Sequence, residues 1–159
     1  MPQRDILTAM SPGGWLRRGT IAAALASVLV GALPAACTSK SGAECVTGLP
    51  AECAPLYPPT FDQIFSRTLA TTCAQPGGVC HATAGVQGGL LFISADSAYA
   101  QLLGQTDGRA RVIPDNPACS LLVERIESSD PAAVMPPKAP LSEAERCSIR
   151  QWIAAGAQR

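Results

Sequence analysis

The chain has 159 residues, in which twelve Lys and Arg balance twelve Asp and Glu and a single histidine occurs. Beyond residue 36 the chain keeps nine basic and eleven acidic side chains, so it has no basic surplus to attract nucleic acid. The roughly 120 residues of this part fit one domain. With 4% aromatic residues its core is modest, and disulfides or a large apolar cofactor would help to stabilise it.

The N-terminus has the layout of an export signal. Arg17 and Arg18 precede an apolar run over 21–33, which small residues and then Cys37 follow. This order predicts a signal peptide over 1–36, and the run is too short for a comfortable membrane span. Leu33 to Cys37 is similar to a bacterial lipobox, although Leu33 stands one position early. We expect Cys37 to be lipidated; ordinary cleavage near Ala36 or an uncleaved anchor are the alternatives.

A lipid on Cys37 would hold the exported chain at a membrane through residues 37–59, a lipid-anchored tether. Residues 38–42 are small and polar, as in a flexible linker, and Pro58 and Pro59 mark its end. Thr38 follows the cysteine, and by analogy with lipoprotein sorting this favours the outer membrane. The expected location is therefore periplasm-facing or the cell surface.

The odd number of cysteines agrees with a lipidated Cys37. Removing it from the seven cysteines leaves an even set, and an even set in an exported chain suggests pairing. Six cysteines allow fifteen connectivities, among which sequence alone does not choose. We predict Cys45–Cys53 and Cys119–Cys147 disulfides, with Cys73 and Cys80 kept apart for another use.

Three helices are predicted before residue 130. Thr60 is a candidate N-cap for a helix over 61–71, whose apolar residues recur at helical spacing. Ser94 introduces a second helix over 95–103, which Gly104 ends. Residues 106–116 are predicted to form a loop, and Pro117 suits the first turn of a third helix.

The last helix has the clearest signature. Residues 130–140 contain four prolines and cannot form a regular helix, whereas Ser142 and Glu145 form a capping box. Behind it, Ile149, Trp152, Ile153 and Gly156 share one face, on which Cys147 does not lie. The chain is therefore predicted to be mainly α, with a small helical domain with long loops over 60–159.

The chemistry of the chain is concentrated in two thiols, one imidazole and one thioether. Cys80 precedes His81, the only histidine, and Met135 is the only methionine beyond residue 36. These groups could attach and ligate a c-type haem. Six residues separate Cys73 from Cys80 where the usual pattern has two, and Gly77 and Gly78 give the loop freedom to fold back. A Cys73–Cys80 disulfide is the alternative, and a zinc site lacks a fourth ligand.

Residues 61–157 resemble the single-haem, class I cytochrome c fold, and among its members the haem-binding modules of planctomycete and myxobacterial exported proteins. The matching segments include Cys80-His81, Arg111-Val-Ile-Pro114, Met135-Pro136-Pro137 and the stretch from Gln151 to Ala157. The resemblance implies one covalent haem c held by Cys73 and Cys80, with His81 and Met135 as iron ligands. Met135 stands 54 residues after His81, near the spacing of that family. Arg109 and Arg111 are either solvated loop residues or partners of haem propionates, and Trp152 packs in the core.

The expected function is that of a non-enzymatic, single-electron carrier whose redox partner protein the sequence does not identify. The alternative is a haem-free module of the same shape, stapled by a Cys73–Cys80 disulfide, with a structural or partner-binding role. The sequence has no Ser-His-Asp order, phosphate-binding glycine loop or acid/base pair. A peroxidase would normally need a second haem or a distal histidine, and the chain has one histidine.

Overall fold

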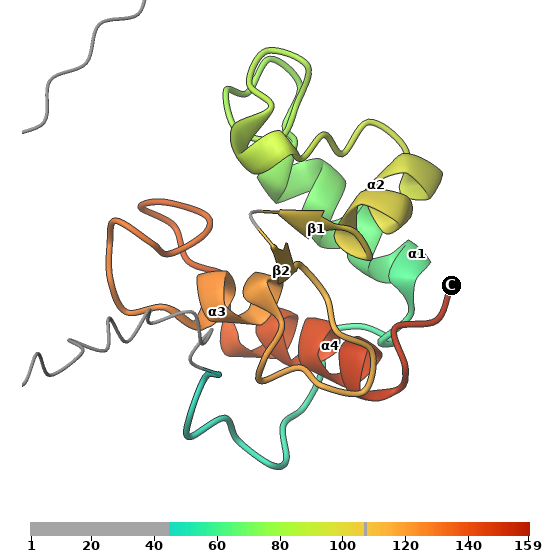
Figure 1. Cartoon of the computed structure of the whole chain (residues 1–159), viewed down its shortest axis with the longest axis vertical. Helices are drawn as coiled ribbons and strands as arrows, with labels where there is room; N and C mark the ends of the chain where they lie inside the picture. Colours follow the sequence, from blue (N-terminus) through green and yellow to red (C-terminus); the bar gives the residue numbers. More distant parts are fainter. Residues whose placement is uncertain (1–44, 107) are drawn as a thin grey trace, which may run out of the picture. The chain divides into compact units, whose positions relative to one another are not determined.

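The computed structural model describes residues 45–106 and 108–159 (Figure 1). The predicted signal peptide and Cys37 lie outside the described residues. Within those two ranges the fold is mainly helical, as expected, and no helix is long and apolar enough to cross a membrane. The elements in chain order are α1 (Phe61–Ile64), η1 (Phe65–Cys73), η2 (Gln87–Gly89), α2 (Ala95–Leu102), β1 (Gln105–Thr106), β2 (Arg109–Ala110), α3 (Leu121–Glu127) and α4 (Glu143–Ala154).

The helix predicted over 61–71 is present and extends two residues further. α1 continues directly into η1, a π-helical stretch that ends at Cys73. Phe61, Ile64 and Leu69 are buried because they recur on one side of the helix. Thr60 is the N-cap, but its side chain forms no capping hydrogen bond, contrary to its expected role.

The second predicted helix is confirmed as α2, and its cap is the expected one. The Ser94 hydroxyl accepts a hydrogen bond from the Ser97 amide at 3.2 Å. Further along α2, the Gln101 side chain accepts from the Leu91 amide and donates to the Leu91 carbonyl, both at 2.8 Å. These two bonds hold the irregular segment before α2 against the helix. Phe92 of that segment is buried.

A small β-hairpin occupies part of the predicted loop over 106–116. β1 and β2 pair in antiparallel fashion, with Gln105 opposite Ala110 and Thr106 opposite Arg109. Gly108 has a φ of +73°, which glycine adopts without strain, so a tight reversal between the strands is possible. The prediction of a loop was therefore wrong for these residues.

The third predicted helix begins later than expected. α3 begins at Leu121, not at Pro117. The residues before it form a turn in which the Ser120 hydroxyl accepts from the Ile113 amide at 2.8 Å and donates to the Asn116 carbonyl at 2.9 Å. Cys119 lies in this turn and is not part of the helix.

α4 is the centre of the core. Its predicted capping box is confirmed, with the Ser142 hydroxyl accepting from the Glu145 amide and the Glu145 carboxylate accepting from the Ser142 amide. The Trp152 ring lies 5.3 Å from that of Phe61, between ring centroids, so α4 packs on α1 through aromatic contact. The fully buried side chains of the core include Ile64, Leu69, Leu102, Val123, Ile149 and Ile153.

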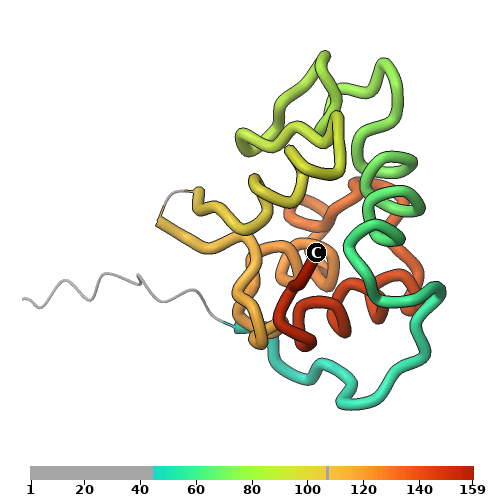
Figure 2. Tube along the Cα trace, turned by 90° about the vertical axis from the view of Figure 1, so that its right-hand side faces the viewer, coloured from blue at the N-terminus to red at the C-terminus, as the bar shows by residue number. Residues whose placement is uncertain are grey.

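The two disulfides differ from the predicted pairs. Cys45 is bonded to Cys119 and Cys53 to Cys147, so the four cysteines were identified correctly but Cys45–Cys53 and Cys119–Cys147 were wrong. Residues 45–59 do not form a local loop; they run alongside α4 (Figures 1 and 2). The Leu56 amide donates to the Ala144 carbonyl of α4 at 2.9 Å, and the Val46 amide donates to the Ala118 carbonyl, in the turn before α3, at 2.8 Å. Cys147, expected away from the buried face, is fully buried because this segment covers its side of α4.

Candidate functional site

A cavity of about 480 Å³ lies between the loop that carries His81 and the end of α3. Its volume is within the range of about 300–1,000 Å³ that is usual for small-molecule and cofactor sites. The walls are mainly apolar, with polar groups at a few positions. The apolar lining comes from η1, the segment before α2, α2 itself and α3: Leu69, Leu90, Phe92, Leu102, Leu122 and Ile126.

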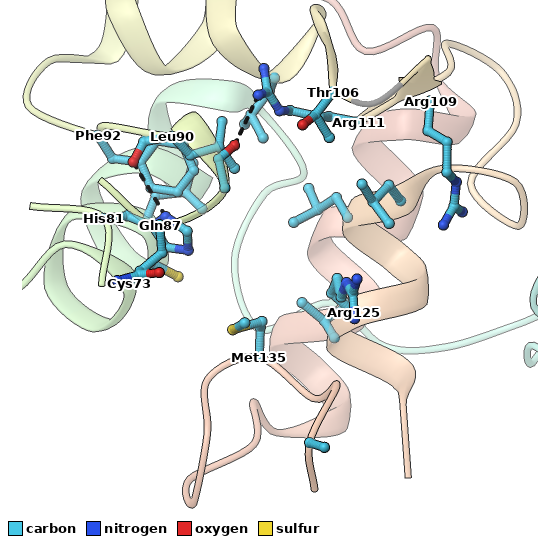
Figure 3. Close-up of a pocket in the computed structure, with 17 residues that line it drawn as sticks. Cys73, His81, Gln87, Leu90, Phe92, Thr106, Arg109, Arg111, Arg125 and Met135 are labelled. Carbon is cyan, nitrogen blue, oxygen red and sulfur yellow. Dashed lines mark hydrogen bonds between the residues drawn. The ribbon is translucent and has the colours of Figure 1, made fainter. Parts of the chain in front are cut away.

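His81 lies on one wall of this cavity, where hydrogen bonds of its backbone and of its ring hold it in place. Its amide donates to the Cys73 carbonyl at 3.2 Å, and its carbonyl accepts from the Phe92 amide at 2.9 Å. Ring atom Nδ1 donates to the Leu90 carbonyl at 3.4 Å (Figure 3). Because a carbonyl can only accept, this bond selects the tautomer in which Nε2 is free to act as a ligand.

Burial lowers the pKa of His81 below its ordinary value, while hydrogen bonds to the Leu90 and Gln87 backbone oppose the shift. A lowered pKa favours the neutral imidazole at neutral pH. Neutral imidazole is the form that binds a metal. The Phe92 ring, 5.1 Å away between centroids, packs beside the imidazole.

Cys73 and Cys80 are both free thiols in the structure and are not joined to each other. Cys73 lines the cavity near His81 (Figure 3), and Cys80 does not line it. Burial, followed by the nearby Cys80 and Glu145, raises the pKa of Cys73 to about 12, so this thiol is protonated at neutral pH. Within residues 45–106 and 108–159 no three His, Cys, Asp or Glu side chains lie together in a group that could hold a metal ion.

Met135 reaches the same cavity from the loop between α3 and α4. Its amide donates to the Arg125 carbonyl at 2.9 Å, and its peptide bond to Pro136 is cis. In Figure 3 the thioether sulfur points toward the side of the cavity where Cys73 and His81 lie. Side chains more than fifty residues apart in the sequence thus face one space, as the haem hypothesis requires.

Arginines supply the positive charge of the cavity. Arg109, Arg111 and Arg125 all line it. Arg109 pairs with Glu124 and holds the pKa of that carboxyl below its ordinary value. Arg111 donates to the Gln101 and Gly88 carbonyls, each at 3.0 Å. Among the described residues, the Nε atoms of Arg109 and Arg111 are buried and have no hydrogen-bond partner.

Sequence reasoning missed two parts of the site. Arg125 gave no signal, because a charged residue near the end of a helix is usually solvated. The Leu90 carbonyl that orients His81 is a backbone group, and such a group has no sequence signature. Trp152, by contrast, packs in the core as expected and is not among the residues that line the cavity.

Comparison with known proteins gives one match. The sequence model of the family described as planctomycete cytochrome C matches residues 79–139, which is less than half of the chain. The matched segment includes Cys80, His81 and Met135 and leaves out Cys73. It supports a cytochrome c-like domain, a class whose members in general bind haem c. No curated protein matches the chain, and no solved structure matches it.

Proposed function

We propose that the chain is an exported lipoprotein whose domain binds one covalent haem c and carries single electrons. One observation carries the proposal: a single apolar cavity is lined by the free thiol of Cys73, the imidazole of His81 and the thioether of Met135. The donor set fits the group. Thiols can form thioether bonds to the porphyrin, and imidazole and thioether are the usual axial ligands of an electron-transfer haem.

Each residue has a distinct role in this proposal. Cys73 and Cys80 would attach the porphyrin, and His81 would bind iron through Nε2, with its ring held by the Leu90 carbonyl. Met135 would be the second iron ligand, and His/Met ligation raises the reduction potential relative to two histidines. The spare donors of Arg109 and Arg111 suit the propionates. The bound haem supplies the reversible one-electron change of its iron, while the protein sets the potential and excludes solvent.

The test is a pyridine haemochrome spectrum of purified, denatured protein made in a periplasm with haem-maturation factors. We expect a c-type band, because only covalent haem survives denaturation and extraction. Its position reports whether one or two thioether bonds formed. Absence of the band, together with a Cys73–Cys80 disulfide by mass mapping, would establish the alternative, a haem-free module with a structural or partner-binding role.

Membrane attachment through Cys37 is a separate part of the proposal. The two disulfides support export, because such bonds persist in oxidising compartments. In cells fed a labelled fatty acid, we expect label on the wild-type protein and none on a Cys37→Ala variant. The wild-type protein should sediment with outer membranes. An unlabelled wild-type protein that is cleaved near Ala36 would contradict lipidation and leave the haem proposal unaffected.

A further inference from the structure

A network of four charged side chains lies where the end of α3 meets the first turns of α4. Arg150 donates a hydrogen bond from Nη1 to Glu127 and another from Nη2 to Glu143. Arg146 Nη2 donates to Glu143 at 2.7 Å, and Arg146 Nε lies 3.1 Å from a Glu127 oxygen, an ion pair by distance without the geometry of a hydrogen bond. The side chain of Arg150 is 5% exposed and that of Glu127 is 12% exposed, so this pair is largely removed from water.

Buried ion pairs of this kind are weak evidence for stability, because the loss of hydration offsets much of their attraction. Their better-attested use is to fix one arrangement of the chain. α3 and α4 are already in contact, and Val123, Ile126, Ile149 and Ile153 of the two helices belong to one buried hydrophobic core. The ion pairs are therefore not needed to bring α3 and α4 together, and they are better placed to fix the position of another segment of the chain.

The network contacts both ends of the loop over 128–141, which carries Met135. Glu127 is the last residue of α3, directly before this loop. At the other end, Arg146 Nη1 donates to the Leu141 carbonyl at 2.8 Å. Arg146 thus holds the entrance and the exit of the loop at once, and Arg150 fixes the carboxylate at the entrance.

The position of Met135 depends on how the loop folds back on α3. The Met135 amide donates to the Arg125 carbonyl, one of the carbonyls that the end of a helix leaves without an internal partner. Within the loop, the Asp130 carbonyl accepts from the Ala133 amide at 2.9 Å and the Val134 amide at 2.8 Å. With both ends held, these bonds leave the thioether little freedom to leave the cavity.

We propose that Glu127, Arg146 and Arg150 form a clamp that holds Met135 at the cavity, where it would bind the haem iron, with Glu127 as the positioning residue that joins α3 to the arginines. This inference rests on the proposed function, because it assigns to the clamp the geometry of one iron ligand. The clamp does not contact the cavity itself: none of its three residues lines it.

The test compares Glu127→Gln with Glu143→Gln. Each variant removes one carboxylate charge from the same two arginines and keeps nearly the same shape. Glu127 belongs to α3 and the loop entrance, whereas Glu143 is part of α4 and is half exposed, so Glu143→Gln leaves the loop ends connected. Arg146→Gln is the second variant: it removes the contacts at both loop ends but keeps the buried Arg150–Glu127 pair, so it preserves the fold.

The first measurement is hydrogen exchange of the Met135 amide in the purified, exported full chain. Exchange should be at least about tenfold faster in Glu127→Gln and Arg146→Gln, because charge-assisted bonds that hold the closed loop are lost. In Glu143→Gln the increase should be below about fivefold, as for other exposed ion pairs. Equal rates in the three variants would overturn the clamp.

The second measurement is the visible spectrum and the reduction potential of the haem-loaded proteins. Glu127→Gln should keep its covalent haem but lose the spectral signature of methionine ligation and have a lower potential, while Glu143→Gln keeps both. A haem-loaded wild type whose methionine signature persists in all three variants would overturn the clamp alone. A wild type without covalent haem would overturn the proposed function.

Discussion

Replacing Cys53 and Cys147 together by alanine should lower the free energy of unfolding by about 4 kcal/mol. A disulfide stabilises mainly by restricting the unfolded chain, and the effect grows with the loop that it closes. With Cys45–Cys119 intact, the shortest path around the second bridge runs over residues 45–53 and 119–147. This path contains about 38 residues, for which loop entropy gives about 4 kcal/mol.

Loss of both bridges should be more damaging than loss of either. Once one is gone, the other closes a loop of 74 or 94 residues and contributes about 4.5 kcal/mol. The combined loss, about 8–9 kcal/mol, is comparable to the whole stability of a typical domain, about 5–15 kcal/mol. A variant without either bridge is therefore expected to be largely unfolded at 37 °C.

Urea unfolding followed by tryptophan fluorescence measures these changes. The matched control is Cys73→Ala with Cys80→Ala in haem-free protein, which removes two sulfur atoms but no cross-link. Its free energy of unfolding should change by less than about 1.5 kcal/mol, a typical effect for single small truncations away from the deep core. If the control were destabilised as much as the Cys53/Cys147 variant, the cross-link would not be the cause.

Replacing His81 by alanine should abolish the spectrum of covalent haem. His81 is the only imidazole in the chain, so no other histidine can take its place. The measurement is haem content per mole of protein, from the pyridine haemochrome band. Thr83→Ala is the control: Thr83 is exposed on the same loop, two residues away, and its haem content should equal that of the wild type. Normal haem content in His81→Ala would contradict the assigned ligand.

Met135 should behave differently from His81. Met135→Leu keeps an apolar side chain of similar volume but removes the sulfur. We expect normal haem content with an altered visible spectrum and a lower reduction potential, because the thioether ligand that raises the potential is lost. Met135→Ala should show the same spectral change. A wild-type spectrum in both variants would exclude Met135 as a ligand.

Local patterns were sufficient to predict the helices and the candidate ligands. The capping box at Ser142, the apolar repeat from Phe61 and the Ser94 cap depend on residues within four positions of one another, so the sequence displays them directly. The candidate site residues stood out because their residue types are rare in this chain. The only histidine follows a cysteine, and one methionine occurs beyond residue 36. By itself the sequence thus determined that helices begin near Phe61, Ala95 and Glu143, and which side chains carry donor chemistry.

Only the tertiary structure decided which distant residues meet. Six cysteines are compatible with fifteen pairings. The observed bridges depend on residues 45–59 lying against the turn before α3 and along α4, across 74 and 94 residues of sequence, which no local pattern records. α3 begins later than predicted from Pro117, because the Ser120 hydroxyl forms hydrogen bonds with the backbone of a turn where helix was expected. The cavity also depends on tertiary structure. Packing between segments far apart in the chain sets the position of the Leu90 carbonyl, of the unpaired Nε donors of two arginines, and of Met135, whose amide bonds to the Arg125 carbonyl.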